Sequence, residues 1–191
     1  QEPQRMSPRQ KMINLMYVVL MAMLALNVSS DVLKGFSLVD KSLNVSTQNA
    51  SLTNAAIYQQ FEEQMQANPT KTREWYEKAM YVRAMSDSLY NFADTLKYLI
   101  VREADGKDAR VDSIRNKEDL EAAAQVMLTT PRATDLLNRI ISYRTRIVQM
   151  VSDPVQRKII EGNFSTEVPE SERIQGKNWE QYMYENMPVA T

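Results

Sequence analysis

Three polar side chains, Arg9, Asn14 and Tyr17, stand at the start of the most apolar stretch of this sequence, which runs from Met12 to Val28. A guanidinium, an amide and a phenol can each hydrogen-bond to a partner, and the guanidinium can also pair with a carboxylate. No aspartate or glutamate lies within the stretch. If protons pass here, the titrating carboxylate therefore belongs to a partner, and the predicted chemistry is recognition.

The composition excludes several kinds of catalytic centre. The chain has no histidine and no cysteine, so a Cys–His zinc site, a cysteine nucleophile and a histidine general base are all impossible. Its four glycines form no phosphate-binding pattern. A net charge of −1 argues against a nucleic-acid partner. We predict no catalytic residues, no metal, no cofactor and no nucleic acid, and we expect that the protein is not an enzyme.

The element that must position these polar residues is the apolar run over residues 12–28. As a helix, about 17 residues would span some 25 Å, the low end of what crosses a bilayer. The run is longer than the core of a signal peptide and no Ala-x-Ala cleavage site follows it, which favours a retained anchor over a cleaved leader. Positive charges before the run place the N-terminus in the cytoplasm. The body would then lie in the periplasm of a Gram-negative cell.

Two interpretations of this anchor remain open. It could be a plain anchor in lipid, with an interfacial tyrosine and cations that reach back to the surface. It could instead pack among other transmembrane helices, where Asn14 would find a hydrogen-bond partner. Ala22 and Ala25 favour the second interpretation, because small side chains let another helix approach closely.

The body after residue 29 has the composition of an all-helical domain. Val32, Phe36, Val39 and Leu43 recur at alternating four- and three-residue steps, which is typical of a heptad seam. Such a seam fits packing against a second copy or, as we favour, against the domain's own helices. We expect further helices to start near Asn68, Asn116, Thr130 and Asp153 and a last apolar cluster to start at Trp179.

Two local features of the body carry smaller predictions. Thr70 or Thr72 is a candidate cap for the helix that follows the break at Asn68. Arg139, Arg144 and Arg146 form a basic patch on a predicted helix. A solvated face is the usual explanation for such a patch.

The fold class that follows is all-α, a single N-terminal transmembrane helix followed by a periplasmic helical bundle. Residues 1–11 form the cytoplasmic segment, residues 12–28 the transmembrane helix and residues 29–191 the bundle. No packed element follows the last apolar cluster, so we expect this sequence to be a fragment of a longer protein with further domains.

The segment MSPRQKMINLMY, residues 6–17, continues through Ala22–Ser29 and closely resembles the start of the GldM/PorM family. These are inner-membrane proteins of the gliding-motility and type IX secretion machinery of Bacteroidetes. The resemblance rests on polar landmarks as well as on apolar composition. The segment Asp31–Phe36 continues it, and the helical body through Tyr182 is compatible with the first periplasmic domain of the family.

The resemblance implies a motor. Family members form a homodimer whose two transmembrane helices sit inside a ring of a polytopic membrane protein, GldL/PorL, similar in plan to the flagellar stator and ExbB–ExbD. Proton flow through the ring is thought to move the dimer, which passes work to further periplasmic proteins of the secretion machinery. Arg9 matches a family arginine thought to contact an acid of the ring, and Asn14 and Tyr17 would also face the ring. For Arg9, a role as a topology signal is the competing interpretation.

We therefore expect the shaft subunit of a motor driven by the proton motive force, one that powers type IX secretion and gliding. The alternative is a bitopic membrane receptor or scaffold with a helical periplasmic domain that binds a ligand or protein. A receptor would need no ring partner, so copurification distinguishes the two.

Overall fold

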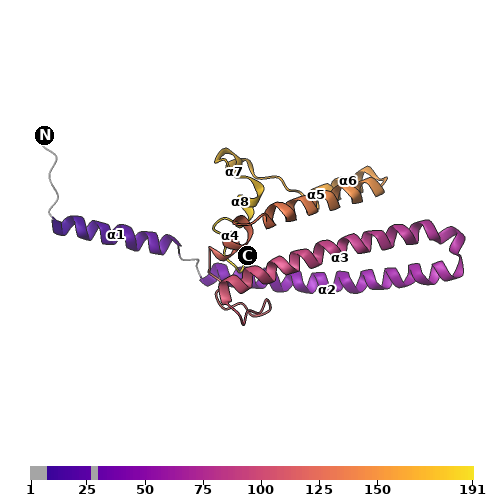
Figure 1. Ribbon diagram of the computed structural model, residues 1–191, viewed down its shortest axis with the longest axis horizontal. Coiled ribbons are helices and arrows are strands. Elements are labelled where there is room, and N and C mark those ends of the chain that lie inside the picture. The colour runs from indigo at the N-terminus through magenta and orange to yellow at the C-terminus, as the bar shows by residue number, and fades with distance from the viewer. Residues whose placement is uncertain (1–7, 27–29) are drawn as a thin grey trace.

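The computed structural model describes residues 8–26 and 30–191, with side chains placed over residues 9–21 and 31–191. All regular secondary structure in these ranges is α-helical, which confirms the predicted all-α class (Figure 1). In chain order the described helices are α1 (Pro8–Leu26), α2 (Ser30–Ala67), α3 (Pro69–Asp105), α4 (Ala122–Leu128), α5 (Arg132–Met150), α6 (Pro154–Asn163), α7 (Glu170–Ile174) and α8 (Trp179–Tyr184).

The long helices α2 and α3 form an antiparallel hairpin that sets the length of the body (Figure 1). The chain reverses at Asn68, whose side chain accepts a hydrogen bond from the backbone N–H of Lys71 at 3.4 Å. This is the N-cap of α3, so the expectation that Thr70 or Thr72 caps the helix is wrong. The hydroxyl of Thr72 instead donates to the carbonyl of Gln64 at 3.2 Å and ties the two helices together.

The core lies where α3, α4, α5 and α8 meet. Met127 on α4 is fully buried, with 0% of its surface exposed. The other buried members of this cluster are Leu96, Val126, Ala133, Leu136 and Trp179. Tyr184 packs edge-on against Trp179, with ring centroids 6.2 Å apart, and its burial raises its pKa to about 12. The apolar cluster predicted at Trp179 is therefore part of the core.

The long connection between α3 and α4 is organised by Asp105. Its carboxylate accepts hydrogen bonds from the backbone N–H groups of Arg115 and Asn116, each at 2.8 Å. These two bonds stabilise the charged form and hold the pKa of Asp105 below its ordinary value of 3.8. Gly106 follows in the left-handed region, with φ of 85°, which lets the chain leave α3.

Acid is expected to release this connection. A carboxyl group whose pKa is lowered in the folded state contributes its stabilisation above the unfolded pKa and loses it as the pH falls through the folded value. Protection of the Arg115 and Asn116 amides from hydrogen exchange should therefore persist at pH 6 and fall below about pH 3.8. The measurement is residue-resolved exchange, expressed relative to the intrinsic rate at each pH.

The substitution Asp105→Asn should weaken the same protection at pH 6 and remove its pH dependence. Asp108→Asn is the matched control, because Asp108 is exposed and lies in the same connection. If Asp105→Asn leaves both amides as protected as in the wild type, the assignment of Asp105 as the organiser of the connection is wrong.

Helix α1 is exposed along the whole of its described length, from Arg9 to Met21. Its first turn contains Arg9, Gln10 and Lys11 after Pro8, and Asn14 follows about one turn later. Within the described ranges, no helix combines the length and the apolarity that crossing a membrane requires. The transmembrane helix predicted over residues 12–28 is therefore not confirmed.

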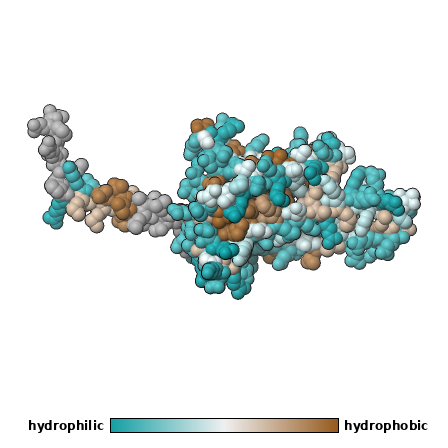
Figure 2. Space-filling model, in the orientation of Figure 1, coloured by the Kyte–Doolittle hydropathy of each residue, from teal (hydrophilic) through white to brown (hydrophobic). Residues whose placement is uncertain are grey.

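Figure 2 shows that apolar side chains reach the surface on α1 and in the middle of the body, among other places. Large apolar residues are also exposed along the α2–α3 hairpin, for example Leu52 on α2 and Trp75 on α3, at 71% and 61%. A single chain therefore leaves a substantial apolar surface uncovered.

Candidate functional site

The predicted ring-contact residues Arg9, Asn14 and Tyr17 all lie on α1 and are all exposed. The side-chain amide of Gln10 donates to the Oδ1 atom of Asn14 at 3.2 Å. Tyr17 follows Asn14 by three residues, a spacing that places both on one side of a helix. The three side chains are thus presented outward, and their contact with a ring stays a prediction.

The packing role of Ala22 and Ala25 also stays a prediction. Both residues lie in α1, but their side chains fall outside the described residues. Residues 27 and 28 at the end of the predicted span lie outside them as well.

The predicted seam on α2 is only partly covered. Phe36 is half-buried, whereas Val32, Val39 and Leu43 are 48%, 57% and 61% exposed. Every α2 residue over 38–57 is exposed. The favoured expectation that the domain's own helices cover this seam is thus not met at three of its four positions. Pairing with a second copy stays a prediction.

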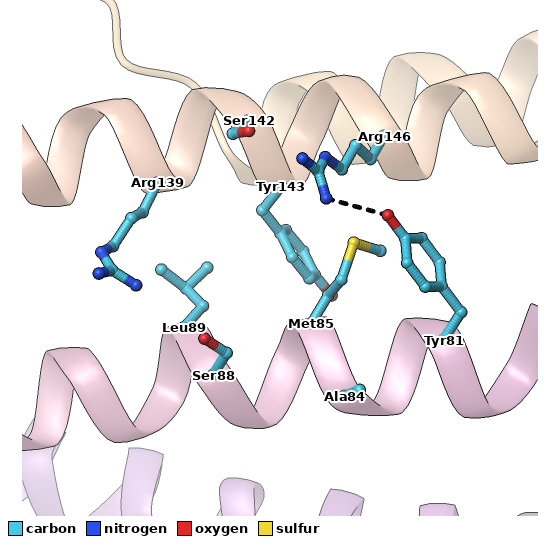
Figure 3. Close-up of a pocket in the computed structure, with 9 residues that line it drawn as sticks. All are labelled: Tyr81, Ala84, Met85, Ser88, Leu89, Arg139, Ser142, Tyr143 and Arg146. Atoms are coloured by element: carbon cyan, nitrogen blue, oxygen red, sulfur yellow. Dashed lines mark hydrogen bonds between the residues drawn. The ribbon is translucent and has the colours of Figure 1, made fainter.

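The structure also contains a groove that sequence reasoning missed. It lies between α3 and α5 and has a volume of about 330 Å³ (Figure 3). Helix α3 contributes Tyr81, Ala84, Met85, Ser88 and Leu89 to its lining, and α5 contributes Arg139, Ser142, Tyr143 and Arg146. The basic patch interpreted as a solvated face therefore supplies two arginines to a groove.

Both groove arginines are held by aromatic side chains of α3. The Nη1 atom of Arg146 donates to the Tyr81 hydroxyl at 2.9 Å, as Figure 3 shows. The guanidinium of Arg139 stacks over the ring of Phe92, 4.1 Å from its centroid. None of the ion pairs found among the described residues involves either arginine. Two positive charges are therefore fixed in place without a carboxylate partner.

The third arginine of the patch has a different role. Arg144 turns away from the groove and donates from Nη1 to the backbone carbonyl of Phe164 at 2.9 Å. The ring of Phe164 in turn lies against Tyr143, with centroids 5.1 Å apart. Arg144 thus holds the segment after α6 against α5.

The sequence offered one signal for the groove. The spacing of seven residues could have shown that Arg139 and Arg146 share one face of a helix, but it could not show which residues of α3 lie opposite them.

Comparison with known proteins identifies the body. The family model described as GldM N-terminal domain matches residues 31–191, which include almost all of α2 and the whole of α3 to α8. No curated protein matches the chain. The segment over residues 6–29, which carried most of the resemblance seen in the sequence, precedes the matched range, so body and N-terminal segment point independently to one family. The chain therefore belongs to the GldM family and is a component of the gliding-motility and type IX secretion machinery.

Proposed function

We propose that this chain is the shaft subunit of an inner-membrane motor that uses the proton motive force to power type IX secretion and gliding. The observation that carries the proposal is the match of residues 31–191 to the GldM N-terminal domain. The role is mechanical and needs neither a cofactor nor a catalytic residue. Work would pass from the membrane segment through the helical body to further periplasmic proteins of the machinery.

The proposed membrane anchor is the run over residues 12–28, with residues 1–11 in the cytoplasm and the bundle over 29–191 in the periplasm. Exposed apolar side chains on α1 support this placement, since Leu15, Val18 and Met21 are 64%, 65% and 67% exposed. Burial of apolar surface contributes roughly 25 cal/mol per Å², so a row of such side chains favours lipid or other helices over water. Arg9 and Lys11 precede the row and fit the positive-inside rule.

The proposed oligomer is a homodimer whose paired helices are enclosed by a ring of a GldL/PorL-type protein. The open seam on α2 supports pairing, because Val32, Val39 and Leu43 carry apolar surface at heptad spacing that α3 leaves exposed. Arg9, at the cytoplasmic edge of the membrane, and Asn14 and Tyr17, within it, would face the ring. The absence of an acid from the run means that the ring would supply the carboxylate that takes up the proton.

Copurification tests the proposal. The 191-residue chain, expressed with the ring protein of the same cell and extracted in a mild detergent, is expected to copurify with it. Native mass measurement of the intact assembly should give two copies of the chain in each ring. A chain that purifies alone would contradict the shaft role and fit the receptor or scaffold alternative.

Two double variants of α2 separate pairing from ring binding in the same experiment. The double variant Val39→Asp with Leu43→Asp should reduce the number of chains in each assembly, because buried carboxylates oppose a seam. Gln48→Asp with Ser51→Asp adds the same charge at exposed polar positions on the side of α2 away from the seam, and it should leave the assembly at two copies.

A further inference from the structure

We propose that the groove between α3 and α5 is a docking site for an acidic segment of a partner protein, bound by Arg139 and Arg146. This surface lies in the body and does not depend on the proposed anchor, dimer or ring. The observation behind it is the pair of guanidiniums that face one groove and that form none of the ion pairs found in the described part of the chain.

The charge on this side of the body is one-sided. Helix α5 carries four arginines and a single acid, Asp135, in a chain whose net charge is −1. No aspartate or glutamate lines the groove itself. Asp135 precedes Arg139 by one turn on α5, and Glu77 precedes Tyr81 by one turn on α3. Because α3 and α5 run in opposite directions, the acids lie beyond opposite ends of the groove (Figure 1). The positive charge of Arg139 and Arg146 is therefore concentrated in the middle of the groove, between these two acids.

The arginines are also arranged before any partner arrives. Stacking on Phe92 and the hydrogen bond to Tyr81 restrict Arg139 and Arg146 to conformations in which both guanidiniums reach into the groove (Figure 3). A fixed guanidinium loses less rotational freedom on binding than a free one and still has N–H groups to donate. A guanidinium held in this way can bind a carboxylate, which can accept two parallel hydrogen bonds from it.

The shape of the groove indicates a segment of protein. Ala84, Ser88 and Ser142 are small and exposed, and they leave space for the ridge of another element. Arg139 and Arg146 are seven residues apart on one helix, which corresponds to about 10.5 Å along its axis. A partner helix with two carboxylates at the same seven-residue spacing would match both charges. The hydroxyls of Ser88 and Ser142 could bind polar atoms beside them.

Peptide binding to the whole 191-residue chain in detergent tests the proposal. The probe is a fluorescent alanine-rich helical peptide with two glutamates seven residues apart, and its control carries glutamine at both positions. We expect the glutamate peptide to bind about tenfold more tightly, with a preference that shrinks as salt is added. Arg139→Gln and Arg146→Gln should each lower affinity about fivefold to tenfold, whereas Arg173→Gln should change it less than about twofold, because Arg173 is exposed on α7 and does not line the groove.

Reversing the charge of both groove arginines distinguishes a specific effect from structural damage, because a damaged protein would not gain affinity for a peptide of the opposite charge. The double variant Arg139→Glu with Arg146→Glu should lose the glutamate peptide and bind the corresponding lysine peptide. Circular dichroism checks that the variants remain helical. Equal binding of glutamate and glutamine peptides, or equal losses in the groove and Arg173 variants, would overturn the proposal. Complete displacement by citrate at the same concentration as the peptide would also overturn it and assign the groove to small anions.

Discussion

Replacing Trp179 with alanine is expected to lower the free energy of unfolding by about 3–5 kcal/mol. Only 8% of the Trp179 surface is exposed, and its ring packs into the cluster that includes Met127 and Leu136. The smaller side chain would leave a cavity in the core and would also remove the edge-on contact with Tyr184. Because α8 reaches the core mainly through this one side chain, the loss should weaken the attachment of the C-terminal helix.

The other tryptophan of the chain provides the matched control. Trp75 lies on α3 and is 61% exposed, with the ammonium of Lys78 5.0 Å from its ring centroid. Trp75→Ala removes the same atoms from the surface and should cost less than about 1 kcal/mol. The comparison isolates the effect of burial, since the two substitutions are chemically identical.

Thermal unfolding measures this difference. For a domain of this size, each kcal/mol shifts the midpoint by roughly 2–4 °C, so Trp179→Ala should unfold about 6–20 °C below the wild type. An independent readout is the phenol of Tyr184, whose pKa of about 12 results from burial and should move back toward its ordinary value of 10.0. Equal midpoints for the two tryptophan variants would show that α8 does not belong to the core.

The helical class and most breaks of the body could be predicted from the sequence because they depend on local chemistry, although the helix expected near Asn116 begins only at Ala122. Asp153 accepts from the backbone N–H of Val155 at 3.1 Å and starts α6, as an aspartate followed by proline predicts. Gly106 ends α3 for an equally local reason. Thr70 and Thr72 were misjudged because Asn68, immediately before α3, already accepts from the backbone N–H of Lys71.

Burial was harder to predict than helicity. Leu96 on α3 is buried whereas Leu43 on the α2 seam is exposed, because α4, α5 and α8 cover the end of α3 while every α2 residue over 38–57 stays exposed even with α3 alongside. A seam therefore indicates which residues lie on one face but not which partner covers them. The groove was missed for the same reason. Arg146 meets Tyr81 across 65 residues of sequence, and only the packing of α5 on α3 brings them together.

The second prediction with a large expected effect concerns Arg9, and it rests on the proposed motor. Replacing Arg9 with alanine is expected to stop gliding and type IX secretion while leaving expression and dimer formation intact. Arg9 is exposed on α1 and is remote from the core, so its loss should not affect folding of the body. At the cytoplasmic edge of the membrane the guanidinium would pair with an acid of the ring, and without it the protonation of that acid would no longer be coupled to the shaft.

Two further variants distinguish this coupling from a simple topology signal. Lys11→Ala removes one positive charge from the same flank, so it should reduce motility as much as Arg9→Ala if the charges only orient the helix. If Arg9 pairs with the ring, Lys11→Ala should remain motile, and Arg9→Lys should retain part of the activity because it keeps the charge but not the forked geometry. Motility and secretion assays in living cells, with protein levels checked in each strain, separate these cases. Normal gliding in the Arg9→Ala strain would remove Arg9 from the mechanism, because a carboxylate inside the ring would then have no need of this cation.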